Sequence, residues 1–414
     1  MKRLIYIEGL KNKYLYDIFV NELKIYNWRK IMKILHLADL HIGKIVLEQS
    51  MLEDQKYMLN QIIQKIKEEK IELVLISGDI YDRSVPPSDA VTVLNNFLKV
   101  LIKDIKLKVC MIAGNHDSKE RLNFGREIFA EEGLFISTDY TGKLDKIELE
   151  DVFGKLNIYM LPYINPVEAR RYFEEEISSF HEAVKAIIDK EDIDTSQRNI
   201  ILSHQFVTAG NVEPEKSESE RLYLGGTENV DVSCYDKFDY VALGHIHGPQ
   251  RIGRDTARYA GTILKYSFSE VNQKKSLTIV DFKEKDDLQM KFVMLKPLRD
   301  MRVIKGPLEE LVKEENYKNT NREDYIRAII TNENAVFDAI GQIKKVYPNT
   351  LRLDIENSKT AQSMEVSMSD LDEIKKKDEL ELFGEFYNFQ HNQNLTETQE
   401  QMMRNVIKEV KKEA

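Results

Sequence analysis

Short groups of acidic, amide and imidazole side chains recur along the sequence. They are Asp39-x-His41, Gly78-Asp79, Gly114-Asn115-His116-Asp117, His204 and Gly244-His245-x-His247. Carboxylate oxygen, amide oxygen and imidazole nitrogen are the ligands expected for divalent cations such as Mn²⁺, Fe²⁺ or Zn²⁺. Residues two apart on an extended chain point to the same side, so both Asp39 with His41 and His245 with His247 could face one site. Together the groups predict a centre for two divalent cations.

Each group is weak evidence when it is taken alone. A histidine at the end of a strand is commonly structural, and a Gly-Asp or Gly-Asn pair is commonly a turn. A metal site is favoured because the groups follow one another at the ends of successive apolar segments. Gly78, Gly114 and Gly244 each precede a candidate ligand, where the backbone must approach the metals closely or turn sharply.

Six apolar segments are predicted to be the buried strands that position these side chains. They are residues 33–39, 73–79, 108–115, 157–163, 199–205 and 240–247, all rich in Val, Ile and Leu. Residues 51–70 and 88–104 have the pattern of amphipathic helices, the second of them with Ser88 as its expected N-cap. The alternation of strands and helices predicts a layered α/β domain with its functional residues at strand ends.

The chain is predicted to have four parts. Residues 1–31 form an N-terminal extension, either an additional basic arm or a segment that precedes the true start at Met32. Residues 32–298 form the α/β domain. Residues 299–357 form a small α+β domain, with strands at 301–306, 325–332 and 351–357 and helices at 307–315 and 334–346. Residues 358–414 form a polar linker and C-terminal helices.

The last predicted helix begins at Thr396, and Gln399 completes a capping box. It carries an apolar stripe that consists of Met402, Met403, Val406, Ile407 and Val410. This stripe either packs on the chain itself or docks onto a partner.

Composition limits the functional classes. The 414 residues carry a formal net charge of −10, which counts mildly against tight DNA binding by the chain alone. This charge is compatible with a metal site or a partner that supplies positive charge. No apolar run reaches about 18 residues, so no transmembrane helix is expected. The N-terminal segment lacks the uninterrupted apolar stretch of a signal peptide, and a cytoplasmic protein is expected. Cys110 and Cys234 are expected to be reduced, and Gly-x-x-x-x-Gly-Lys-[Ser/Thr] does not occur.

At this point the motifs resemble a known family. The set DLH, GDxxD, GNHD, a single His and GHxH resembles the signature of calcineurin-like metallophosphoesterases. The segments HLADLHIGK (36–44), SGDIYDR (77–83), IAGNHDS (112–118), ILSHQFV (201–207), LGHIH (243–247) and YAGTILKYSFSE (259–270) are similar to the nuclease subunits of SbcC–SbcD DNA-repair complexes. The resemblance is close from residue 32 to 270 and looser beyond.

This resemblance implies a fold and a set of roles. The fold would be a four-layer metallophosphoesterase β-sandwich flanked by helices, with a small α+β capping domain and a C-terminal helical tail. One metal would be held by Asp39, His41 and His247, the other by Asn115, His204 and His245, and Asp79 would bridge the two. His116 would be the catalytic histidine that is not a ligand, and Asp117 would orient its ring or brace the loop. Asp82 and Arg83 belong either to a substrate-binding loop or to a surface turn.

The implied function is a Mn²⁺-dependent DNA nuclease in repair, recombination and replication. It would be a 3′–5′ exonuclease on double strands and an endonuclease on single strands or hairpins. An ATPase of the SbcC type, with a coiled coil, would be the partner of a homodimer within a heterotetramer, with no membrane involved. The alternatives are a phosphodiesterase that acts on a small molecule or a phosphoprotein, and a non-catalytic scaffold. Loss of a ligand or of His116 would have favoured the scaffold, and none is lost.

Overall fold

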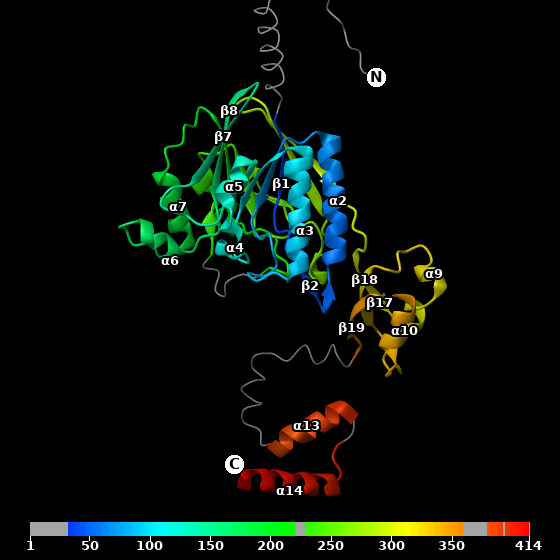
Figure 1. Ribbon diagram of the computed structural model, residues 1–414. Coiled ribbons are helices and arrows are strands. Elements are labelled where there is room, and N and C mark those ends of the chain that lie inside the picture. Colours follow the sequence, from blue (N-terminus) through cyan, green and yellow to red (C-terminus); the bar gives the residue numbers. More distant parts are fainter. Residues whose placement is uncertain (1–31, 221–227, 359–378, 392–393, 414) are drawn as a thin grey trace, which may run out of the picture. The chain divides into compact units, whose positions relative to one another are not determined.

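The computed structural model describes residues 32–220, 228–358, 379–391 and 394–413 (Figure 1). The predicted extension 1–31 lies outside these residues, as does 359–378, which is most of the predicted linker. The chain divides into two compact units. The first contains the residues up to Val303 together with Asn321–Arg327, and the second contains Ile304–Thr320 together with the residues from Ala328 on.

One six-stranded sheet of the first unit has the order β16-β15-β1-β4-β5-β6. Its strands are β1 (Lys33–Leu37), β4 (Leu73–Ser77), β5 (Lys108–Ile112), β6 (Leu134–Ser137), β15 (Ser276–Phe282) and β16 (Leu288–Met294). The first four strands are parallel, and β15 and β16 extend the sheet in antiparallel fashion. Parallel strands have all their carboxyl ends at one edge of the sheet, so residues that follow β1, β4 and β5 are neighbours there.

A second six-stranded sheet has the order β13-β14-β12-β9-β8-β7. Its strands are β7 (Asp145–Asp151), β8 (Gly154–Leu161), β9 (Arg198–His204), β12 (Tyr240–Gly244), β13 (Gln250–Ile252) and β14 (Arg254–Tyr259). The strands β8, β9, β12 and β14 are parallel. All six segments predicted as strands of the α/β domain are therefore strands, and five of them, β1, β4, β5, β9 and β12, end at or within a few residues of a candidate ligand.

The two sheets pack face to face. Ile34, Leu75 and Ile112 of the first sheet share one buried apolar cluster with Ile200 and Leu202 of the second. Fully burying such a side chain contributes about 1.5–3 kcal/mol.

Helices cover the outer faces of both sheets. Helices α2 (Leu52–Glu69) and α3 (Ser88–Lys99) lie side by side over the first sheet, and α7 (Phe180–Lys190) packs its apolar face on the second (Figure 1). The layers are helix, sheet, sheet and helix, as predicted. Pro87 rather than Ser88 occupies the N-cap position of α3, so the expected serine cap is wrong by one residue.

Shorter elements connect these layers. They are β2 (Ile45–Val46), β3 (Gln49–Ser50), α4 (Lys119–Asn123), α5 (Arg126–Glu131), α6 (Pro166–Ala169), β10 (Val207–Thr208), β11 (Val230–Asp231), the π-helix η1 (Val100–Ile105), and the 3₁₀ helices η2 (Arg170–Tyr172), η3 (Val232–Tyr235) and η4 (Phe268–Glu270).

A three-stranded sheet of order β17-β18-β19 follows, and the division between the units passes through its first two strands. The elements from here on are β17 (Met301–Gly306), α8 (Leu308–Leu311), α9 (Glu314–Tyr317), β18 (Tyr325–Ile330), α10 (Ala339–Val346), β19 (Thr350–Ile355), α13 (Glu379–His391) and α14 (Glu397–Glu413). The helix predicted at 307–315 is instead two short helices, because Lys313 has an extended backbone. The helix predicted from residue 334 begins only after Asp338.

The capping box at the start of α14 is confirmed. The Thr396 backbone N–H donates to Gln399 Oε1 at 2.9 Å, and the Gln399 backbone N–H donates to Thr396 Oγ1 at 3.4 Å. Helices α13 and α14 pack against each other. Among the helices of the described residues, none is long and apolar enough to span a membrane.

Candidate metal centre

The structure brings all seven predicted ligands to one place, where strands of both sheets end. Asp39 and His41 follow β1, Asp79 follows β4, Asn115 follows β5, His204 ends β9, and His245 and His247 follow β12. Asp39, His41, Asp79 and His245 have positive φ angles of 50°, 44°, 49° and 96°. Backbone in this region is strained for residues other than glycine, and such strain is characteristic of functional sites.

One half of the centre consists of Asp39, His41 and His247, whose ligand atoms lie within 4.8 Å of one another. All three residues are buried. The Nε2 atoms of His41 and His247 are 3.1 Å apart. Two nitrogen ligands at right angles on one cation, each with a bond of about 2.1 Å, are separated by about 3.0 Å. The two rings are therefore spaced as ligands of a single cation.

The other half consists of Asn115, His204 and His245. The Oδ1 atom of Asn115 lies 3.0 Å from His204 Nε2 and 3.2 Å from His245 Nδ1. His204 Nδ1 is 2.7 Å from the carbonyl oxygen of Ser77, which can only accept, so Nδ1 carries a proton. In a neutral His204 ring, Nε2 then carries a lone pair. This lone pair points at Asn115 Oδ1, which is also an acceptor. A cation between His204 Nε2 and Asn115 Oδ1 would resolve this conflict.

Asp79 lies between the two halves. Its Oδ1 atom is 3.4 Å from His204 Nε2, and its Oδ2 atom is 3.5 Å from His41 Nε2. One carboxylate oxygen therefore faces each half of the centre. This is the placement that a carboxylate shared by two cations requires.

A buried carboxylate oxygen of Asp39 also fits a two-metal centre. Asp39 Oδ1 accepts a hydrogen bond from the His245 backbone N–H at 2.9 Å, whereas Oδ2 is buried with no hydrogen-bond partner among the described residues. A buried carboxylate oxygen without a partner is unfavourable unless a cation compensates for it.

The pKa values of the ligands reflect their burial and mutual charge. Burial lowers the pKa of His204, but the charge and hydrogen bond of Asp79, with the charge of Asp39, raise it to about 9. Burial raises the pKa of Asp79, but the charges of His204, His41 and His116 bring it well below its usual value. The carboxylates thus favour positive charge at this position, and a proton on His204 supplies it when a cation does not.

His116 lies at the edge of the centre. Its Nδ1 atom is 2.8 Å from the carbonyl oxygen of Asp82, so Nδ1–H donates and Nε2 is available to a substrate. Nε2 is 3.9 Å from Asp79 Oδ2, and the His116 ring meets the His41 ring edge-on with centroids 4.8 Å apart. The residue is 9% exposed, which leaves the ring at the boundary between the centre and solvent.

Asp117 holds two loops together. Its Oδ2 atom accepts the backbone N–H groups of Ile80 at 3.1 Å and Gly114 at 2.9 Å, and its Oδ1 atom accepts that of Tyr81 at 2.9 Å. Of the two roles expected for Asp117, these contacts support bracing of the loops. The carbonyl group of Asp82 orients the His116 ring instead.

Asp82 and Arg83 have different environments. Asp82 is buried, and its Oδ1 atom accepts a hydrogen bond of 2.7 Å from Lys44 Nζ and lies 3.8 Å from His41 Nδ1. Arg83 has a side chain that is 61% exposed, with Nε 3.6 Å from Asp82 Oδ2. Asp82 therefore belongs to the surroundings of the centre, and Arg83 faces solvent beside it.

The glycines that precede the ligands are required by close backbone packing. A Cβ atom on Gly244 would lie 1.9 Å from the Ser77 carbonyl oxygen, and one on Gly114 would lie 2.1 Å from Asp79 Oδ1. Real Cβ atoms essentially never approach other atoms this closely. The expectation that the backbone approaches the site closely at these glycines is confirmed.

Several residues that support the ligands were missed in the sequence. Gln55 Nε2 donates to the His41 carbonyl oxygen at 2.7 Å, and Gln55 Oε1 accepts from the Gly43 N–H at 2.9 Å. Glu228 Oε2 lies 3.8 Å from His245 Nε2. Glu270 ends the segment YAGTILKYSFSE, whose family resemblance was the one available signal. The others have no local pattern, because their role comes from long-range contacts.

The acidic stretch 213–220 (EPEKSESE) has the composition of a surface loop, but its end contacts the candidate centre. Ser219 Oγ lies 2.6 Å from His247 Nδ1, and Glu220 Oε1 accepts the His247 backbone N–H at 2.8 Å. The end of this stretch is therefore held against a candidate metal ligand.

Known proteins show a clear relationship. The family profile described as calcineurin-like phosphoesterase matches residues 32–249. The SbcD subunit of the nuclease SbcCD from Staphylococcus epidermidis is 36% identical over 383 residues, which cover 91% of this chain and 98% of that protein. The chain belongs to the SbcD family of calcineurin-like phosphoesterases. A second profile, described as type 5 capsule protein repressor C-terminal domain, matches residues 297–391 of this SbcD family member.

Two solved structures are more distantly similar. A dimetal phosphatase from Danio rerio has 12% sequence identity and a TM-score of 0.38, over 65% of this chain and 98% of the other. A Thermus thermophilus protein has 12% identity and a TM-score of 0.36, over 64% of this chain and 99% of the other. As a calcineurin-like phosphoesterase, this SbcD family member is a hydrolase of phosphoester bonds, and its cluster of histidines and acids fits a two-metal site.

Proposed function

We propose that this phosphoesterase is a DNA nuclease that acts with an ATPase of the SbcC type in repair, recombination and replication. It would degrade double strands in the 3′–5′ direction and cut single strands and hairpins. The match to the SbcD subunit of the staphylococcal nuclease carries the proposal, because it spans 91% of the chain and so continues well beyond the metal centre. A phosphodiesterase for small molecules needs neither the small α+β domain nor the C-terminal helices. The same proposal places the protein in the cytoplasm with the DNA.

Two divalent cations are proposed as cofactors, and Mn²⁺ is the metal we favour. The resemblance to SbcD nucleases favours Mn²⁺, whereas the set of two carboxylates, one amide and four histidines, taken alone, suits Fe²⁺ and Zn²⁺ as well. Asp39, His41 and His247 would hold one cation, Asn115, His204 and His245 the other, and Asp79 both. When bound, such cations lower the pKa of a coordinated water and neutralise charge on the phosphate.

The chain's own contribution to bond cleavage is proposed to come from His116. The Asp82 carbonyl oxygen fixes the proton of the ring on Nδ1, so Nε2 is the atom that exchanges a proton with the substrate. A protonated Nε2 can donate to the 3′ oxygen as it leaves, and the product then carries a 5′ phosphate. Asp117 keeps His116 in place by joining the loops that follow β4 and β5.

The later parts of the chain are proposed to serve the DNA and the partner. Residues 299–357 would cap the DNA, and 358–414 would dock on the coiled coil of the ATPase. Met402 and Val406 of α14 are 65% and 45% exposed, whereas Met403 and Ile407 are partly buried. The apolar stripe is thus only partly covered by its own chain. The sequence contains no phosphate-binding loop motif, so another polypeptide must bind ATP.

A homodimer within a heterotetramer is the proposed assembly. Helices α3, α4 and α5 are proposed to form its interface. Phe124 and Ile128 at α4 and α5 are 81% and 69% exposed, and Val91 of α3 is 44% exposed. Val91 and Phe124 line one hollow of the surface together with Phe129, and exposed apolar side chains that lie together are typical of a protein interface.

The test is a cleavage assay with substrates of each class. The purified chain, with and without an SbcC-type ATPase and ATP, is incubated with Mn²⁺ and linear duplex DNA, hairpin DNA, a small phosphodiester or a phosphopeptide. The proposal predicts DNA cleavage in the presence of Mn²⁺ that the partner and ATP stimulate on duplex ends. Cleavage of the small phosphodiester or the phosphopeptide alone, with partner and ATP present, would contradict it.

A further inference from the structure

A chain of polar side chains leads away from His247 on the side opposite the metal centre. His247 Nδ1 lies 2.6 Å from Ser219 Oγ, and this hydroxyl group also contacts Glu270 Oε1. Glu270 Oε2 in turn accepts a hydrogen bond of 2.6 Å from Lys275 Nζ. Glu270 is fully buried and Lys275 is 6% exposed. The proposed function assigns no role to Ser219, Glu270 or Lys275.

The ion pair between Glu270 and Lys275 determines the direction of the hydrogen bonds along this series of side chains. A carboxylate paired with a buried ammonium group is ionised and can only accept. The Ser219 hydroxyl group therefore donates to Glu270, and its lone pair accepts the proton of His247 Nδ1. This leaves the lone pair of the His247 ring on Nε2, the atom that lies 3.1 Å from His41 Nε2 in the centre.

We propose that Ser219, Glu270 and Lys275 position His247 by fixing its tautomer and its ring orientation for metal binding. This inference rests on the proposed role of His247 as a ligand. A His247 ring with its proton on Nε2 instead of Nδ1 would present N–H to the cation and could not bind it. Loss of a group that orients a metal-binding histidine typically weakens metal binding about 10- to 100-fold.

The backbone of His247 is held by the same surroundings. Lys275 Nζ donates to the His247 carbonyl oxygen at 2.9 Å, and Glu220 accepts the His247 N–H. The third acceptor of Lys275 is Gln273 Oε1 at 2.6 Å, so each of its three N–H groups has a partner. Ring and peptide of His247 are thus fixed together, and the buried charge of Lys275 is compensated within the chain.

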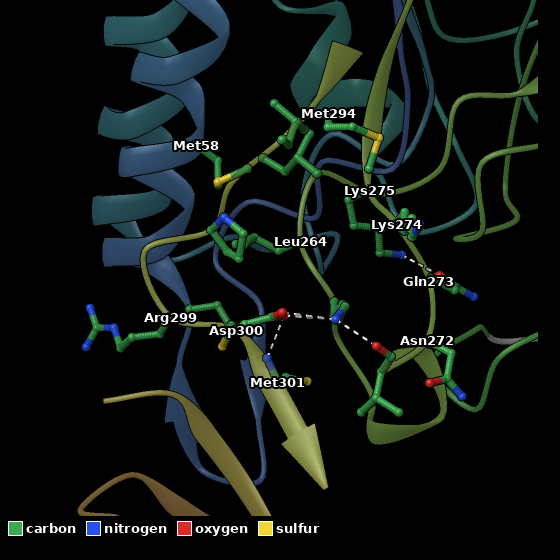
Figure 2. A pocket seen from close by; sticks show the side chains of 16 residues that line it. Met58, Leu264, Asn272, Gln273, Lys274, Lys275, Met294, Arg299, Asp300 and Met301 are labelled. Atoms are coloured by element: carbon green, nitrogen blue, oxygen red, sulfur yellow. Dashed lines mark hydrogen bonds and ion pairs between the residues drawn. The ribbon is translucent and has the colours of Figure 1, made fainter. Parts of the chain in front are cut away.

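A cavity of about 380 Å³ lies beside Lys275, and Figure 2 shows the residues that line it, Gln273 among them. An anion in this cavity would be an alternative partner for Lys275. Of the other cations of the wall, Lys265 is paired with Asp300 at 2.9 Å, Arg299 is paired with Asp54 at 3.1 Å, and Lys274 is exposed to solvent. The wall therefore does not require an anion, and Lys275 acts toward Glu270 and His247.

The test compares three variants of the full chain with the wild type. Ser219→Ala removes the hydroxyl group, and Ser219→Thr retains it. Ser196→Ala is the matched control, because Ser196 Oγ also donates to a carboxylate, Asp194 at 2.6 Å, in an exposed position. Two properties are measured: the number and affinity of bound Mn²⁺ ions by calorimetry, and the protonated nitrogen of His247 by NMR of ¹⁵N-histidine-labelled protein without metal.

The inference predicts that Ser219→Ala weakens one of two Mn²⁺ sites about 10- to 100-fold and reduces protonation of His247 Nδ1. Ser219→Thr and Ser196→Ala should resemble the wild type in both measurements. Unchanged Mn²⁺ affinity and an unchanged tautomer in Ser219→Ala would overturn the inference. The NMR measurement requires neither DNA cleavage nor bound metal, so it distinguishes failure of this inference from failure of the nuclease proposal.

Discussion

Gly244→Ala should damage the metal centre although it replaces no ligand. The new Cβ atom would lie 1.9 Å from the Ser77 carbonyl oxygen and 2.7 Å from His204 Nδ1. Ordinary contact begins at 3.4 Å, so the Ser77 oxygen must move by about 1.5 Å, or the strands β4 and β12 must separate by a similar amount. That oxygen is the hydrogen-bond acceptor that orients His204, at 2.7 Å.

The expected magnitude has two parts. Overpacking of this kind destabilises a protein by about 1–3 kcal/mol, which lowers the melting temperature by several degrees in a unit of this size. Loss of the group that orients His204 should weaken binding at its half of the centre about 10- to 100-fold. Metal content after dialysis, Mn²⁺ affinity and the rate of DNA cleavage are measured together with thermal unfolding.

Gly248→Ala is the matched control. Its Cβ atom would meet only the side-chain ends of Gln273 at 3.2 Å and Gln250 at 3.3 Å, which can move aside. This variant should resemble the wild type. A Gly244→Ala protein with wild-type metal content and activity would refute the argument that the packing of Ser77 against Gly244 holds His204 in place.

Three further predictions concern protonation and partner binding. Mn²⁺ affinity should rise about tenfold per pH unit from pH 6.5 to 8.5, because binding must displace the proton from His204, whose pKa is raised to about 9. Calorimetry in buffers of different ionisation enthalpy should detect one released proton. An affinity that does not change with pH would be contrary evidence. Burial, with the charge of Arg258, lowers the pKa of His36 to about 3, so its contribution to folding stability is complete above pH 6.5 and decreases as the pH falls toward 3. Wild type should therefore lose about 2 kcal/mol more than His36→Gln between pH 7 and 5 in urea unfolding, and equal losses would rule this out. The double variant Met402→Asp/Val406→Asp should fail to bind an SbcC-type ATPase in a pull-down, while its basal cleavage stays unchanged. The control variant Asn405→Asp, also on α14, should bind the ATPase normally.

Local pattern was sufficient to predict the strands and to place the candidate ligands at their ends. Val, Ile and Leu in β4 and β9 are buried on both faces, and that produces a continuous apolar run that is visible in sequence. His204 follows such a run directly, so its position at the sheet edge could be inferred.

The residues that support the ligands could not be predicted in this way. Glu270 and His247 are 23 positions apart in the sequence and are joined through Ser219, which precedes both and lies in a polar stretch. Such a stretch is compatible with a surface loop as well as with a buried contact. Gln55 lies on the buried face of an amphipathic helix, where its polar side chain has no counterpart in the apolar pattern. Only the three-dimensional contacts reveal what these residues hold.

The central claim is that seven residues hold two cations while His116 is a catalytic residue and not a ligand. Its most direct test is to measure bound Mn²⁺ and cleavage of linear duplex DNA in the same preparations of wild type, His116→Ala and Asp79→Ala. The account predicts two Mn²⁺ ions and cleavage in the wild type, and weaker metal binding with no cleavage in Asp79→Ala. In His116→Ala it predicts two ions with cleavage slowed about 10²- to 10⁴-fold. Wild-type cleavage by His116→Ala, or loss of metal from it, would contradict the account.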